Sequence, residues 1–100
     1  MLAMKILQER FYPSARRVLA LAGEKEDAPE YLVGYDVDGN QVFHVPSPEG
    51  YSFLYLCSHT MAEAAVVCGY KEADADGCWP DYYFAVDHES GKLNRICKAR

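Results

Sequence analysis

Apolar and polar residues alternate in two stretches of the chain, and each stretch has a turn signal at its centre. In residues 31–45 the pair Asp38-Gly39 predicts a type I′ hairpin turn, because both turn positions of that type require a positive φ. Centring the turn there sets Val33 opposite His44. Three further pairs follow from the same register: Val37 with Asn40, Tyr35 with Val42, and Gly34 with Phe43.

The second alternating stretch turns at Ser90-Gly91 and pairs Glu89 with Lys92 across the strands. This register gathers apolar side chains on one face, namely Tyr82, Phe84, Val86, Leu93 and Cys97. Arg95 falls on the same face. A cation in that position indicates either a different register or the edge of a sheet.

Between the two hairpins the pattern predicts a central strand followed by a helix. Residues 51–57 are apolar at positions that face both sides of a pleated strand. Thr60 and Glu63 have the spacing of a capping box, and Gly69 is a typical residue after a helix end, so a helix is expected over residues 60–68. Its small and apolar residues lie all around the axis, which hints that a partner subunit covers one side.

The first quarter of the chain is ambiguous. Pro13-Ser14 followed by residues 15–22 and a glycine has the start and stop signals of a helix, although Arg16 and Arg17 in the first turn oppose the helix dipole. Residues 4–11 fit a strand or a short helix. The expected fold is a single α+β domain over residues 1–100. It has a mainly antiparallel sheet of about five strands, two hairpins plus the central strand, with one or two helices on one face.

Charge changes this picture most, because it is sorted along the chain. Residues 24–89 contain fourteen Asp or Glu and only two Lys, a net charge of −12, whereas residues 1–23 and 90–100 together carry +7. A strongly acidic body selects partners by charge and speeds their encounter. The basic ends could contact nucleic acid only if they formed one patch, and the acidic body would repel it, so direct nucleic-acid binding is not expected.

Composition narrows the class of protein. Half of the residues are hydrophobic and a quarter are charged, which is typical of a globular domain. The longest apolar runs are too short to span a bilayer, and the first residues lack the pattern of a signal peptide. The four cysteines, without a CxxC pair, are therefore expected as reduced thiols in the cytoplasm.

Catalytic and metal motifs are nearly absent, so no cofactor or metal is expected. No GxSxG, P-loop, GxGxxG or HExxH pattern occurs. Cys57 and His59 could form a thiol nucleophile with its base, and a fold that added Cys78 and His88 would provide zinc ligands. This alternative, a small metal- or thiol-dependent enzyme, competes with a simpler interpretation, in which Cys57 is buried at the end of a strand and His59 lies beside a helix cap. The pairs Asp36/Asp38 and Asp74/Asp76 resemble fragments of a calcium loop, but turn chemistry explains them more simply.

The eight tyrosines and one tryptophan are the remaining signal, since such residues dominate binding hot spots. An acidic stretch surrounds the tryptophan and provides the candidate partner-binding residues Glu72, Asp74, Asp76, Trp79, Asp81 and Tyr82. These features predict a non-enzymatic inhibitor that occludes a basic, nucleic-acid-handling protein, as toxin-immunity proteins and phage anti-defence proteins such as anti-CRISPRs do. A homo-oligomeric structural subunit, such as a homodimer, is a further alternative.

Overall fold

Eight antiparallel strands form two four-stranded sheets in the computed structural model, which describes residues 5–25, 28–72, 77 and 80–99. None of these residues belongs to a helix, so the expected α+β fold is wrong and the described fold is all-β. The first sheet contains β1 (Lys5–Tyr12), β2 (Arg17–Gly23), β3 (Tyr31–Tyr35) and β4 (Gln41–Pro46). The second contains β5 (Tyr51–His59), β6 (Ala62–Tyr70), β7 (Asp81–Val86) and β8 (Leu93–Lys98).

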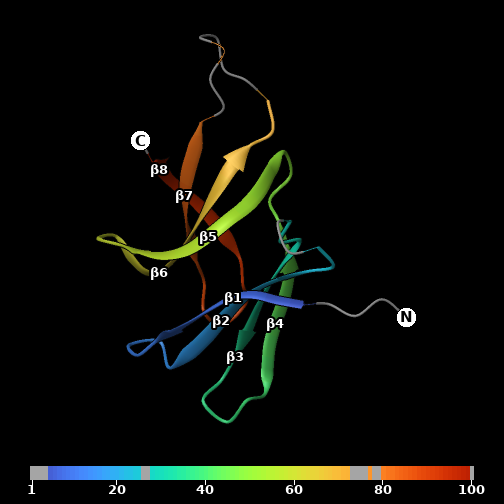
Figure 1. Ribbon diagram of the computed structural model, residues 1–100. Helices are drawn as coiled ribbons and strands as arrows, with labels where there is room; N and C mark the ends of the chain where they lie inside the picture. The colour runs from blue at the N-terminus through green and yellow to red at the C-terminus, as the bar shows by residue number, and fades with distance from the viewer. Residues whose placement is uncertain (1–4, 26–27, 73–76, 78–79, 100) are drawn as a thin grey trace.

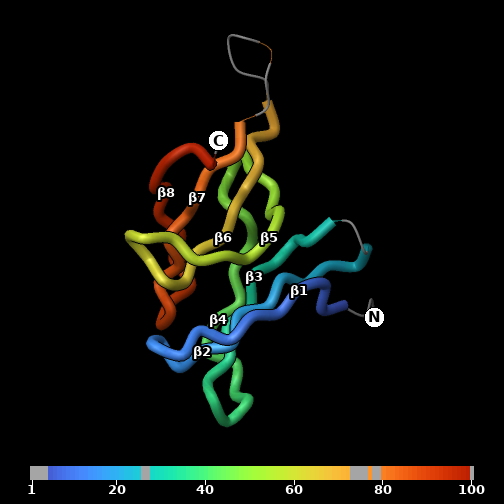
Figure 2. Tube along the Cα trace, turned by 60° about the vertical axis from the view of Figure 1, so that its left-hand side comes forward, coloured from blue at the N-terminus to red at the C-terminus, as the bar shows by residue number. Residues whose placement is uncertain are grey.

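Each sheet is a meander in which consecutive strands are neighbours, in the orders β1-β2-β3-β4 and β5-β6-β7-β8. Figures 1 and 2 show the two sheets one above the other, joined by the short connection from β4 to β5. Strands β1 and β2 pack against β5, so contact between the sheets is concentrated beside this edge strand. The buried core draws on both sheets and contains Tyr12, Leu19, Leu21, Leu32, Phe43, Phe53, Leu56, Ala64, Val66, Cys68, Phe84 and Val86.

The helix expected over residues 60–68 is instead the second half of a hairpin. Strand β5 continues to His59, the chain turns at Thr60-Met61, and β6 runs antiparallel to β5. Residues 64–68 are all buried, because β6 is an inner strand whose two faces are both covered within the chain. A strand of this kind has no apolar alternation, so its pattern matches that of a buried helix. The hint of a partner subunit that rested on this helix is therefore withdrawn.

The helix predicted over residues 15–22 is also wrong, again because these residues belong to a strand that is buried on both faces. They form most of β2, the second inner strand, in which residues 19–23 are buried. Pro13 starts a tight turn rather than a helix, since its carbonyl accepts a hydrogen bond from the Arg16 amide at 3.1 Å. Arg16 has a φ of 54°, in the left-handed region, which ends any helical path there. Of the two readings of residues 4–11, the strand is confirmed by β1.

The hairpin of β3 and β4 is confirmed, with a correction at its turn. Val33 pairs with His44 and Gly34 with Phe43 as expected, but a bulge then sets Tyr35 opposite Gln41. Gly39 has a φ of 86°, whereas Asp38 has no positive φ, so the turn is not type I′. The Asp36 carbonyl accepts the Gly39 amide at 3.1 Å, which makes a type I turn followed by a left-handed glycine, while the bulge itself lies at Val42, the residue without a partner on β3.

The hairpin of β7 and β8 is also present, but the expected register is wrong. The closing pair is Asp87 with Lys92, whose carbonyl accepts the Asp87 amide at 2.9 Å, and Phe84 lies opposite Arg95. Beyond this pair Tyr83 faces Cys97, so Ile96 is an extra, bulged residue. The bulge moves Cys97 away from the apolar face on which it was expected. The position of Arg95 is explained by β8 being an edge strand.

The turns of the two hairpins are stabilised in the same way, although their sequences are not similar. In each, an aspartate at the end of the third strand of its sheet accepts backbone amides of the following turn with its own carboxylate. Asp36 Oδ1 accepts the amides of Asp38 and Asn40, both at 2.9 Å. Asp87 Oδ1 accepts the amides of Glu89 at 2.9 Å and Ser90 at 3.4 Å. These hydrogen bonds lower the pKa of both carboxyl groups, with the Asn40 and Glu89 amides the largest causes.

Polar side chains of β1 connect the first sheet to β5. The Gln8 side-chain oxygen accepts the Leu56 amide, and the Tyr12 hydroxyl donates to the Cys57 carbonyl at 2.6 Å. Tyr12 is 1% exposed, and burial raises the pKa of its phenol to about 12. Because β5 is an edge strand, these bonds partner a backbone edge that would otherwise be open to other chains.

Phe43, on β4, makes a further contact between the two sheets. Its ring lies against Gly34, its neighbour on β3, and against Gly91 in the turn between β7 and β8. A methyl group on either glycine would overlap the ring, and Gly91 also has a φ of 78°. One aromatic side chain therefore fixes how closely the β7–β8 hairpin approaches the first sheet.

Candidate protein-binding surface

Three tyrosines and one arginine gather at the end of the second sheet where β5 begins and β6 ends. We call Tyr51, Tyr70, Tyr82 and Arg95 the tyrosine cluster. The ring centroid of Tyr51 lies 5.1 Å from that of Tyr70 and 5.9 Å from that of Tyr82. The three tyrosines are half-buried and Arg95 is exposed, so the cluster offers aromatic surface that a partner could cover.

Arg95 holds the cluster together. Its guanidinium lies 4.8 Å from the centre of the Tyr82 ring, a cation–π distance, and its Nη1 donates to the Tyr51 hydroxyl at 3.1 Å. This hydrogen bond is the main cause that raises the pKa of the guanidinium. Two rings from β5 and β7 are thereby fixed by one side chain from β8. Rigid tyrosines lose little conformational entropy on binding.

The acidic stretch, which we define as residues 72–81, connects the strands that carry the cluster. It follows Tyr70 and leads into β7 at Asp81, and the Tyr70 amide donates to the Pro80 carbonyl at 2.9 Å. Of the predicted partner-binding residues, Glu72 is exposed, and Asp81 and Tyr82 are half-buried. Asp74, Asp76 and Trp79 lie outside the described residues. The structure thus brings the described members of the set to one end of the second sheet.

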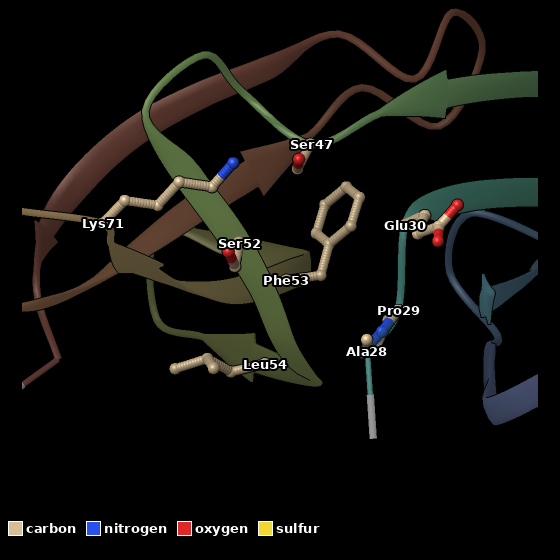
Figure 3. Close-up of a pocket in the computed structure, with 8 residues that line it drawn as sticks. All are labelled: Ala28, Pro29, Glu30, Ser47, Ser52, Phe53, Leu54 and Lys71. Carbon is tan, nitrogen blue, oxygen red and sulfur yellow. The ribbon is translucent and has the colours of Figure 1, made fainter. Parts of the chain in front are cut away.

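A groove adjoins this end of the sheet, between the start of β5 and the segment that precedes β3. Its volume is about 340 Å³. Figure 3 shows Phe53 in the middle, with Lys71 on one side and Glu30 on the other. The lining residues are Ala28, Pro29, Glu30, Ser47, Ser52, Phe53, Leu54 and Lys71. The groove carries a cation and a carboxylate on opposite sides and indicates no specific ligand, but it lies next to the candidate surface.

Sequence reasoning found Tyr82 but missed the rest of the cluster. Tyr51 and Tyr70 are far apart in sequence and become neighbours only through the β5–β6 register. In the sequence, Arg95 was the residue that indicated a contact of this kind, because a cation on an apolar strand face requires a partner. The aromatic rings supply that partner here.

The residues expected to form a thiol or metal site are not brought together as predicted. His59 contacts Cys97 rather than Cys57, with 3.7 Å between Nε2 and Sγ. Cys57 is half-buried, and burial raises the pKa of its thiol, which opposes a nucleophilic role. His88 lies in the β7–β8 turn, where its carbonyl accepts a hydrogen bond from Arg17, and Cys78 is outside the described residues. Within the described ranges no three His, Cys, Asp or Glu side chains lie close enough to hold a metal ion.

Two other candidate sites are resolved by contacts already described. Asp36 and Asp38 belong to the β3–β4 turn, where the Asp36 carboxylate is occupied by backbone amides, while the Asp74/Asp76 pair lies outside the described residues. Three arginines of the basic ends have hydrogen-bond partners in different parts of the fold. Arg10 donates to Ser58, Arg17 to the β7–β8 turn, and Arg95 to the tyrosine cluster.

Searches for similar proteins found no family model, no curated protein and no solved structure that matches this chain. The described part of the chain contains no helix that is both long and apolar enough to cross a membrane.

Proposed function

We propose that the protein is a non-enzymatic inhibitor that binds a basic protein through the tyrosine cluster and the acidic stretch beside it. The observation that carries this proposal is the packing of Arg95 between Tyr51 and Tyr82 at the end of the sheet from which the acidic stretch leaves. A preorganised aromatic centre with charged surroundings is the arrangement found at protein-binding hot spots.

The two parts of the surface would contribute differently. Tyrosine rings that are half-exposed in the free protein would be buried in the complex, and their area would slow dissociation. The carboxylates of the acidic stretch, together with the exposed Glu49 before β5, would attract a basic partner over long range and speed association. The same negative charge disfavours direct binding of nucleic acid.

The partner we propose is a protein that itself handles nucleic acid in the cytoplasm. Such proteins present Lys- and Arg-rich surfaces to phosphate, and an acidic protein bound there would occlude the working surface. Three described cysteines, Cys57, Cys68 and Cys97, are free thiols, which suits a reducing compartment.

The test begins with affinity capture of the tagged protein from its native source at two salt concentrations, followed by mass spectrometry of the retained proteins. Binding kinetics of the retained protein are then measured for matched variants. Tyr82→Ala is expected to weaken binding roughly thirtyfold, mostly through faster dissociation, as hot-spot truncations do. Its control is Tyr35→Ala, which truncates a half-buried tyrosine on the other sheet.

A second pair of variants tests the electrostatic part. Glu72→Gln with Asp76→Asn should slow association and reduce its dependence on ionic strength, whereas Asp38→Asn at the tip of the β3–β4 hairpin should leave both unchanged. Equal effects of Tyr82→Ala and Tyr35→Ala would refute the binding surface. An association rate that ignores ionic strength would refute the role of the acidic stretch.

A further inference from the structure

The β5–β6 turn brings an imidazole against an exposed cysteine on the opposite edge strand of the second sheet. His59 Nε2 lies 3.7 Å from Cys97 Sγ, although these residues belong to β5 and β8. The His59 ring also packs on Tyr83 of β7, with 4.8 Å between centroids. Two bulges produce this meeting, one between Cys57 and His59 and one at Ile96, since each re-aims the side chain that follows it.

The hydrogen bonds of His59 decide which of its nitrogens carries the proton. The Met61 amide donates to Nδ1 at 3.1 Å, so Nδ1 is an acceptor without a hydrogen. In the neutral ring the hydrogen is then on Nε2, and it points to Cys97 Sγ. His59 is therefore arranged as a hydrogen-bond donor to the sulfur and not as a base that removes its proton.

We infer that Cys97 is a modification site, an exposed thiol that lies against the Nε2–H group of His59 and reacts with small disulfides. A hydrogen bond to a charged acceptor is stronger than one to a neutral acceptor, so the Nε2–H group gives the sulfur a hydrogen-bond partner when it is charged. The thiolate is the nucleophile in disulfide exchange, and Cys97 is exposed on an edge strand where a small reagent can reach it.

The reaction is thiol–disulfide exchange. The thiol proton leaves to solvent, and the Cys97 sulfur attacks one sulfur of the small disulfide. A new S–S bond forms to the protein while the S–S bond of the reagent breaks. The other half of the reagent leaves as a thiolate, so Cys97 is oxidised and the leaving half is reduced.

The other described cysteines serve as internal references. Burial raises the pKa of the Cys68 thiol to about 12 and also raises the pKa of the half-buried Cys57 thiol. Neither has an imidazole donor among its hydrogen bonds in the described part of the chain. Both should react more slowly than Cys97 as long as the protein is folded.

The experiment treats the full chain with a symmetrical aromatic disulfide at neutral pH and follows each cysteine by peptide mass spectrometry over time. Cys97 should react first. The decisive variant is His59→Asn, because the asparagine side-chain oxygen can still accept the Met61 amide while the donor to Cys97 is lost. This variant should slow Cys97 roughly threefold to tenfold and leave Cys57 and Cys68 unchanged.

Unfolded protein in denaturant gives the reference in which all cysteines of both variants react alike. Should His59→Asn unfold the chain, Cys68 would become fast, and the ratio of Cys97 to Cys57 in the unaltered protein then decides. The inference is overturned if Cys97 reacts no faster than Cys57, or if folded His59→Asn leaves the Cys97 rate unchanged.

Discussion

The contact of Phe43 with two glycines gives the sharpest test of how the sheets are held together. Three glycine-to-alanine variants separate backbone strain from steric overlap. Gly39 has a φ of 86° and open space around it, so Gly39→Ala measures backbone strain alone. Gly34 has no positive φ but lies against the Phe43 ring, so Gly34→Ala measures overlap alone. Gly91 has both features.

The magnitudes follow from these differences. An alanine in the left-handed region costs about 1 kcal/mol in Gly39→Ala. Forcing a methyl group into a packed ring costs about 1–3 kcal/mol in Gly34→Ala. Gly91→Ala should therefore lower the free energy of unfolding by about 2–4 kcal/mol, the sum of the two effects. For a domain of this size each kcal/mol of unfolding free energy that is lost lowers the midpoint of thermal unfolding by about 4–8 °C.

The assay is urea unfolding at constant temperature, supported by thermal melts. The midpoints of the variants are compared where the slope of unfolding free energy against urea concentration is unchanged. A double-mutant cycle identifies the group that is overlapped. Phe43→Leu shortens the side chain, so Gly91→Ala should cost less in that background than in the natural one by about 1 kcal/mol or more. Equal losses for Gly91→Ala and Gly39→Ala, or strict additivity with Phe43→Leu, would refute the contact as a constraint between the sheets.

Three further changes probe the turns, the buried phenol and the bulge. The pKa of Tyr12 is raised from 10.0 to about 12 in the folded protein, so the stability that the protonated phenol contributes is complete below pH 10 and is lost as pH rises towards 12. Tyr12→Phe should therefore reduce alkaline unfolding, measured by circular dichroism. The carboxyl groups of Asp36 and Asp87 have pKa values lowered from 3.8, so they stabilise the fold above that pH and lose the effect as pH falls below it; Asp36→Ala with Asp87→Ala should flatten the acid limb of stability against pH. Deleting Ile96 removes only the bulged residue and should preserve the strand register, whereas deleting Asn94 should shift it and destabilise far more in the same melts.

Local turn chemistry made the two hairpins predictable, and burial on both faces made two strands unpredictable. Asp38-Gly39 and Ser90-Gly91 mark their turns within a few residues. Residues 19–23 and 64–68 are inner strands covered on both sides, so they lack the alternation that identifies a strand. A helix prediction fitted them equally well from sequence, and only the pairing with neighbouring strands decides between the two.

Register was the second limit, because a bulge moves every later residue to the other face. The expected pairing of β7 with β8 put Cys97 beside Phe84, whereas the bulge at Ile96 puts it beside Tyr83. The same limit hid the site. The candidate pair of Cys57 and His59 relied on sequence proximity, while the observed partner of His59 is 38 residues away.

The bulge at Ile96 also explains how one short edge strand carries two unrelated groups. Arg95 and Cys97 would share a face in a regular strand, since their spacing is two residues. The extra residue between them separates the faces, so Arg95 reaches the tyrosine cluster while Cys97 reaches His59. Binding through the cluster would therefore leave the thiol uncovered.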